Sequence, residues 1–227
     1  MISSRYALIN VKKSLCLYWL KRKNMQIKYL LVLLTGLFFH ANILADSPLT
    51  STNFSKAYKD AKIVQLAAVS NGSISELLMD YLIYEDNPID LKIAAINELG
   101  WSLRGKNNAG LFYAYMKYRN VLEDIDQASA DILICYAYFM ALDDYFDVEE
   151  AIVFANKAKA KNPSSYTIQI ITALIEAQKA LDNKENWCEV YSLTNRVRNN
   201  KALTQDMNEE AIAIIFKYMD LYKENCD

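Results

Sequence analysis

The sequence predicts an all-α fold of stacked antiparallel helical hairpins, and two observations lead to this prediction. Helix breakers are rare, because the 227 residues include only 5 glycines and 3 prolines, whereas good helix formers are abundant. In addition, signals for the first helix of a pair recur near residues 53, 88, 129, 164 and 206, a spacing of 35 to 42 residues. Such a period is typical of α-solenoids, in which each hairpin packs on its neighbours. We therefore expect about four hairpins and a C-terminal capping helix, with an irregular helical bundle as the alternative.

Turn and capping signals divide the chain into individual helices. The Asn71-Gly72 pair predicts a turn after the first helix, and Asn87-Pro88 predicts the start of the third. Three further starts are predicted by pairs with the spacing of a capping box, namely Ser73 with Glu76, Asp147 with Glu150 and Asp206 with Glu209. The expected helices are residues 53–69, 73–84, 88–105, 107–122, 129–142, 148–161, 164–181, 185–199 and 206–223.

Two of the expected hairpins resemble tetratricopeptide-type repeats, in the segments "NELGWSLRGKNNAGLFYAY" and "ALDDYFDVEEAIVFANKAKAKNP". The matching residues fall at the family's close-packing and turn positions: Leu99, Gly100, Gly105, Ala109, Ala151, Ala155, Ala158 and Pro163. In this interpretation Leu99-Gly100 lies in the middle of a helix and Gly105 lies at the turn. The resemblance extends over about half of the chain, and the uneven spacing departs from a strict 34-residue repeat. It implies a TPR-like α-solenoid with a concave groove for a protein partner, and it implies no catalysis.

Residues 25–45 have the features of a secretory signal peptide. Lys28 supplies the basic start, residues 29–39 supply an apolar run, and Ala45 supplies the small residue at the cleavage site. The run is shorter than the roughly 20 residues that a membrane-spanning helix needs. We therefore expect cleavage near Ala45, with a cut after Ala41 as the weaker alternative and an uncleaved anchor as the other.

The predicted signal peptide defines the remaining parts of the chain. Residues 1–24 are interpreted as an extension upstream of a start at Met25, or as a long basic region of the signal peptide itself. Residues 46–52 are expected to be a flexible segment before a single helical-repeat domain at residues 53–227. We expect the protein in the periplasm or secreted, without stable membrane insertion after cleavage.

Removal of the leader changes the charge and the chemistry of the chain. Residues 1–45 hold 7 of the 25 basic residues and none of the 27 acidic ones, so the remainder has 18 basic residues and a net charge of −9. This charge disfavours nucleic acid and favours a basic partner. The only histidine, His40, also lies in the leader, and histidine is the commonest general base and metal ligand. The sequence therefore predicts no catalytic, cofactor or metal site.

The cysteine positions predict one disulfide. Cys188 and Cys226 lie symmetrically about residue 207, close to the expected turn between the last two helices. Symmetric positions lie side by side in an antiparallel hairpin, and an oxidising compartment permits the bond. Closing this loop is expected to contribute about 3 to 4 kcal/mol. Cys135, within an apolar run, is interpreted as a buried thiol.

Aromatic and polar residues around one turn are the candidate contacts for a partner. They are Trp101, Arg104, Lys106, Asn107, Asn108, Tyr113 and Tyr118. Tyr and Trp are enriched at interfaces, but they also fill the core of hairpin stacks, and the polar residues also serve to cap helices. The acidic stretch 143–150 lacks the alternating oxygens and the glycine of a calcium loop, so we interpret it as a helix N-terminus.

Three classes of function are compatible with these features. The first is a non-enzymatic helical-repeat protein that binds a protein or peptide, and its narrower form is an immunity or inhibitor protein against a basic secreted toxin. The second is a cell-envelope hydrolase that acts through carboxylates. The third is a structural component of the envelope that associates with itself.

Overall fold

The computed structural model describes residues 47–226, and residues Asp46–Asp227 form one compact unit. The predicted start at Met25, the signal peptide and its cleavage near Ala45 lie outside the described residues. The described chain is all-α, as predicted, and Ser165 and Thr204 form an isolated β-bridge between two loops. Its elements are η1 (Phe54–Tyr58), α2 (Lys62–Ala68), α3 (Glu76–Ile83), α4 (Ile89–Leu99), α5 (Asn108–Tyr118), η2 (Ile125–Gln127), α6 (Ala130–Asp143), α7 (Glu149–Lys161), α8 (Tyr166–Ala180), η3 (Lys184–Asn186), α9 (Trp187–Asn199), α10 (Glu209–Met219) and η4 (Asp220–Asn225), where η marks a 3₁₀ helix.

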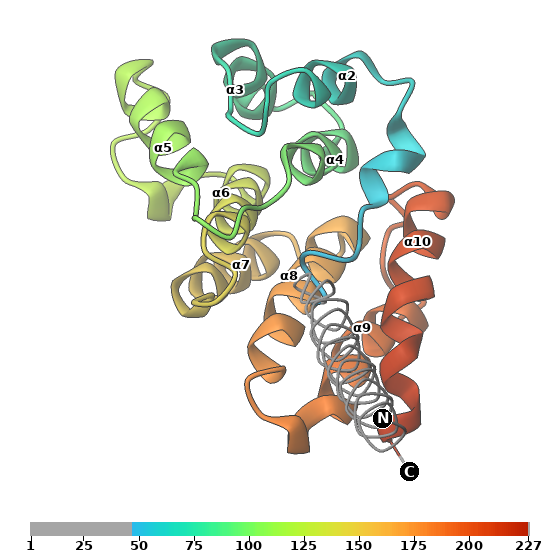
Figure 1. The fold of residues 1–227 in the computed structure, drawn as a ribbon. Helices are drawn as coiled ribbons and strands as arrows, with labels where there is room; N and C mark the ends of the chain where they lie inside the picture. The colour runs from blue at the N-terminus through green and yellow to red at the C-terminus, as the bar shows by residue number, and fades with distance from the viewer. Residues whose placement is uncertain (1–46, 227) are drawn as a thin grey trace, which may run out of the picture. The chain divides into compact units, whose positions relative to one another are not determined.

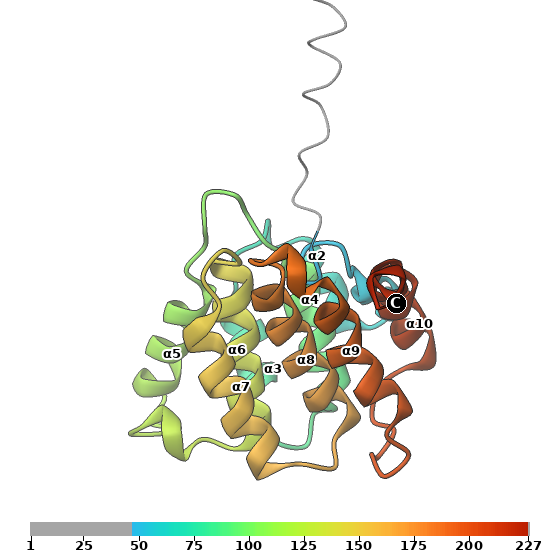
Figure 2. The ribbon, with the colours of Figure 1, turned by 90° about the horizontal axis from the view of Figure 1, so that it is seen from below.

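Sequential hairpins build the part of the domain from α6 onwards. Helix α6 packs on α7, α7 on α8, and α8 on α9, and these helices lie side by side in Figure 2. Helices α4, α6 and α8 also contact one another in succession, as the first helices of stacked pairs do. The apolar helix α6 is buried on most sides, and Cys135 within it is a fully buried free thiol, as predicted.

The helices before α6 do not pair in chain order. Helix α2 packs mainly on α4 rather than on α3, and α5 packs on α6 and α3 rather than on α4 (Figure 1). The expected helix 53–69 is divided into η1 and α2, so α2 is short and buries little more than Val64 and Ala67. The expected pairing of 88–105 with 107–122 was therefore wrong.

Gly100 explains why the helix that begins at Ile89 ends early. The sequence pattern placed Leu99-Gly100 in mid-helix, but α4 ends at Leu99 and Gly100 follows with a φ of 65°. An α-helix cannot contain this left-handed backbone conformation, which glycine adopts without steric cost. Gly105 consequently lies in an extended loop, residues 100–107, instead of at a tight hairpin turn.

Helix caps lie slightly after the predicted capping boxes. The side chain of Ser75, not of Ser73, accepts a hydrogen bond from Leu78 N at the start of α3. At α10 the cap is Asn208, which accepts from Glu210 N at 2.8 Å. Asp206 instead accepts from Thr167 N at 2.7 Å, so this side chain joins two helix starts rather than capping its own helix.

The segment before η1 is packed rather than flexible. Leu49 is 2% exposed, and Thr52 Oγ1 donates to Pro48 O. Asn97 on α4 holds the segment in place, because its side chain donates to Thr52 O and accepts from Ser55 N at 2.9 Å. Burial of an apolar side chain together with these bonds fixes residues that composition alone suggested to be loose.

The C-terminal helix covers the N-terminal segment. Helix α10 packs on η1, and Asn208 N donates to Tyr58 OH at 3.0 Å. Across the described residues, no helix is long and apolar enough to cross a bilayer.

Candidate functional site

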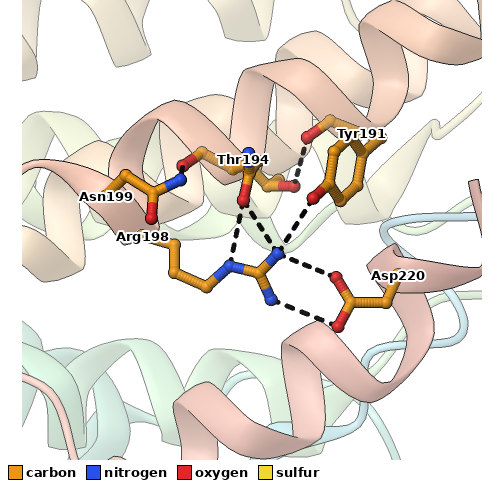
Figure 3. Close-up of polar contacts among 6 residues, drawn as sticks. Tyr191, Thr194, Arg198, Asn199 and Asp220 are labelled. Carbon is orange, nitrogen blue, oxygen red and sulfur yellow. Dashed lines mark hydrogen bonds and ion pairs between the residues drawn. The ribbon is translucent and has the colours of Figure 1, made fainter. Parts of the chain in front are cut away.

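A disulfide and an ion pair fasten the C-terminal helices together. Cys188 and Cys226 lie at disulfide distance, with Cα atoms 4.7 Å apart, so the predicted pairing is confirmed. Figure 3 shows Arg198 of α9 reaching across to Asp220, with a shortest N–O distance of 2.9 Å. The Arg198 guanidinium also lies over the ring of Phe216, 4.1 Å from its centroid. These contacts hold α10 and η4 against α9.

A cavity that the sequence did not predict lies beside this disulfide. We name it the C-terminal aromatic pocket; its volume is about 520 Å³ and its lining residues are Leu181, Trp187, Tyr218, Leu221, Tyr222 and Asn225. Trp187 and Tyr222 meet edge to face, with ring centroids 6.1 Å apart, and Leu221 is 66% exposed. The position of Trp187 directly before Cys188 was the available signal, because the disulfide brings this residue to the end of the last helix.

Two of the predicted partner-binding residues are engaged within the protein itself. Lys106 Nζ donates to Leu99 O and Gly100 O at 2.5 and 2.8 Å, and thereby caps the end of α4. Burial lowers the pKa of Lys106, and the nearby charge of Asp143 partly offsets this effect. Asn108 Oδ1 accepts from Ile74 N at 3.0 Å, and Asn108 is 3% exposed. Both side chains therefore position the loop.

Tyr113 and Tyr118 lie on α5 rather than in the loop, and Asn107 is the last residue of the loop. The ring of Tyr113 is half-buried against Tyr136, 6.1 Å between centroids. Tyr118 is 81% exposed, but it lies at the opposite end of α5. Asn107 is exposed at the start of that helix, and its side chain makes no capping hydrogen bond.

Trp101 and Arg104 belong to a surface made by two loops, where Trp101 contacts Tyr145 and Arg104 lines a cavity that Tyr145 also lines. We name residues 100–107 and 144–148 the paired loops. The ring of Trp101 meets Tyr145 edge to face at 5.2 Å between centroids, and the Tyr145 and Phe146 ring centroids are 4.2 Å apart. Leu103 and Phe146 are 65% and 70% exposed. Between the loops is a cavity of about 260 Å³, lined by residues 102–105 and 143–146.

Two buried polar atoms at this cavity have no hydrogen-bond partner among the described residues. They are Asp143 Oδ1 and the hydroxyl of Tyr145, whose residues are 7% and 3% exposed. The other carboxylate oxygen of Asp143 accepts from Ala109 N at 2.8 Å. Burial raises the pKa of Asp143, while the hydrogen bond from Ala109 N, the nearby backbone N–H of Asn108 and the charge of Lys106 oppose the rise. Such unsatisfied buried groups are uncommon in folded proteins.

The sequence located one half of this surface and not the other. Trp101 and Arg104 were predicted as partner contacts, whereas 143–150 was interpreted only as an acidic helix start. The cue that went unused was the place of Asp143, directly after the buried apolar run of α6. The proximity of the two loops depends on tertiary packing, which one sequence does not display.

The described residues contain no group of three or more His, Cys, Asp or Glu side chains that could hold a metal ion. Comparison of the chain with protein-family models, curated proteins and solved structures found no match. The tetratricopeptide-type resemblance therefore stays a prediction.

Proposed function

We propose that this domain is a non-enzymatic protein-binding domain and that the paired loops contact the partner. The observation that carries the proposal is the exposure of Leu103 and Phe146, 65% and 70%, on adjacent loops around one cavity. Large apolar side chains in such a position are typical of interaction surfaces. Trp101 and Arg104 belong to the residue types that dominate binding energy at interfaces.

The loops are held in place before any partner arrives. Lys106 and Asn108 bond the first loop to neighbouring backbone, and Lys106 N donates to Asp143 O at 3.1 Å, which joins the two loops. A preorganised surface loses less conformational entropy on binding. The rigidity of the loops thus supports a binding role.

The charge of the domain indicates a basic partner. Residues 46–227 carry a net charge of −9, and Asp144, Glu149 and Glu150 are exposed on or next to the second loop. Complementary charge steers association and raises its rate. An inhibitor of a basic secreted protein is the narrower form of this proposal. A disulfide is typical of proteins from oxidising compartments, which supports a periplasmic or secreted setting.

Affinity capture with matched variants tests the proposal. The tagged full chain and its Leu103→Asp, Phe146→Asp and Leu221→Asp variants are each used to capture proteins from an envelope extract, and circular dichroism confirms that each variant is folded. Leu221 is a matched control, because it is 66% exposed and lies at the C-terminal aromatic pocket. We expect the loop variants to lose a basic partner by roughly 30-fold in affinity, the effect of one strong contact residue, while Leu221→Asp retains it. A partner retained by both loop variants and lost by Leu221→Asp would assign the function to the other pocket.

A further inference from the structure

We infer that the cavity between the paired loops receives one lysine side chain of the partner, whose ammonium group binds between Asp143 and Tyr145. This inference rests on the proposed function, because it assigns the chemistry of the partner residue that enters the loop surface. It accounts for two buried acceptor atoms, Asp143 Oδ1 and Tyr145 OH, that nothing else in the described residues satisfies.

The energetics of these two atoms point to a ligand that donates hydrogen bonds. A buried acceptor without a donor destabilises the folded protein, and the penalty is larger for a carboxylate than for a neutral group. Asp143 and Tyr145, the residues that carry these two acceptors, both line the cavity between the paired loops. A group that donates to both would recover the lost interactions, and its positive charge would compensate the carboxylate.

The size of the cavity limits the ligand to a single side chain. Pockets for small organic ligands usually measure about 300 to 1,000 Å³, and this cavity measures about 260 Å³. Leu103 and Phe146 line it and are exposed. They can cover the methylene stem of a long side chain whose charged end lies deeper.

Lysine fits this site better than arginine. A guanidinium binds a carboxylate best through two parallel hydrogen bonds. Asp143 offers only one oxygen without a donor, because Oδ2 already accepts from Ala109 N at 2.8 Å. An ammonium is a compact donor with three rotatable N–H groups, so it can bond one carboxylate oxygen and one hydroxyl.

Two neighbouring basic residues affect how strongly the cavity binds a cation. Lys106 has its ammonium on Leu99 O and Gly100 O. Arg104 is exposed and lines the cavity, so its charge opposes an incoming cation. Removing this charge is therefore expected to strengthen lysine binding, the opposite of removing the charge of Asp143.

The test is an NMR titration of the full chain with butylammonium, the side-chain analogue of lysine, and in parallel with butylguanidinium and neutral 1-butanol. We expect saturating shifts of residues 102–105 and 143–146 with butylammonium, and weaker shifts with the other two probes. Asp143→Asn should lower the affinity about tenfold or more, the loss expected for a hydrogen bond to a charged group. The side-chain amide oxygen of this variant can still accept from Ala109 N, and Tyr145→Phe provides a second variant that removes only the hydroxyl.

Two further variants make the result decisive. Asp147→Asn removes the same charge from an exposed position of the same loop and should change the affinity less than about twofold. Arg104→Gln should raise the affinity. Shifts that are absent, that are spread over other acidic surfaces, or that respond equally to Asp143→Asn and Asp147→Asn would overturn the inference. Because this titration needs no partner, it can fail while the loop variants still lose the partner in the capture experiment. Likewise, the capture experiment can fail while the titration succeeds.

Discussion

The two ends of the domain are built by different means. From α6 to α9, helices pair in chain order; α10 packs mainly on η1, and a disulfide with the Arg198–Asp220 ion pair fastens η4 to α9. Before α6, helices pair out of order, and side-chain bonds to distant backbone fix them, as Asn97 does for residues 52 and 55. The comparison teaches that the length of a turn does not decide the pairing alone. The connection 144–148 joins two closely packed helices, whereas the equally short connection 84–88 joins α3 to α4, which contact each other little.

The largest effect is expected at the C-terminal end. Cys188→Ser should lower the free energy of unfolding by about 4 kcal/mol, because the bond closes a loop of 38 residues and the entropy of the unfolded chain then rises. Urea unfolding with and without a reductant measures this difference. The reduced wild type should be as stable as the variant. Equal stability of the oxidised and the reduced wild type would show that the disulfide does not stabilise the domain.

The next effect concerns the ion pair that joins the two ends. Lys92 of α4 is 1% exposed, and its Nζ lies 3.2 Å from Asp131 Oδ2 at the start of α6. Asp131→Ala leaves a buried ammonium without its partner and should cost about 3 kcal/mol, whereas Lys92→Met, which removes the charge, should be close to neutral. Thermal unfolding of both variants tests this asymmetry. Equal losses in the two variants would contradict it.

A smaller loss is expected at the N-terminal end. Asn97→Ala removes bonds to Thr52 O, Ser55 N and Tyr138 OH and should cost about 2 kcal/mol. Asn156 is the matched control, because it is exposed and its side-chain hydrogen bond is 3.4 Å long; Asn156→Ala should cost less than about 0.5 kcal/mol. Hydrogen exchange should show that Asn97→Ala loosens η1 and α4 and leaves α9 protected. Uniform loosening would mean that the two ends are one cooperative unit.

The smallest expected effect is a gain in stability when the charge of Asp143, next to the paired loops, is removed. Burial raises the pKa of Asp143 above its value in the unfolded chain, so the ionised carboxylate destabilises the folded protein at neutral pH. Asp143→Asn should therefore be more stable than the wild type at pH 7. The difference should shrink as the pH falls through the raised pKa, because both proteins are then neutral at this position. Denaturation of both proteins between pH 7 and pH 4 measures this stability difference. A difference that is constant with pH would exclude the buried charge of Asp143 as its cause.

The sequence predicted the fold class and most helix starts, but not how all the helices pair. Starts expected near 88, 129, 164 and 206 lie at 89, 130, 166 and 209, because caps and turns are local signals. The symmetric cysteines were also correctly paired, since η4 returns along α9 and brings the two positions together. The division of the first helix and the pairing of α2 with α4 involve bonds such as that from Ser55 to Asn97, 42 residues apart.

The sequence predicted only one of the two loops of the candidate site, because the position of the other loop also depends on tertiary packing. Trp101 and Arg104 indicated one loop through their residue types. Leu103, Tyr145 and Phe146 complete the surface only once α4 and α6 have packed and the loops that follow them line one cavity.

Hydrogen–deuterium exchange of the full chain, free and bound to its captured partner, tests the central claim most directly. We expect new protection of backbone amides in residues 100–107 and 144–148, with no change around Leu181, Trp187 and Leu221 of the C-terminal aromatic pocket. Protection confined to that pocket, with the paired loops exchanging as in the free protein, would contradict the assignment of the binding surface to these loops.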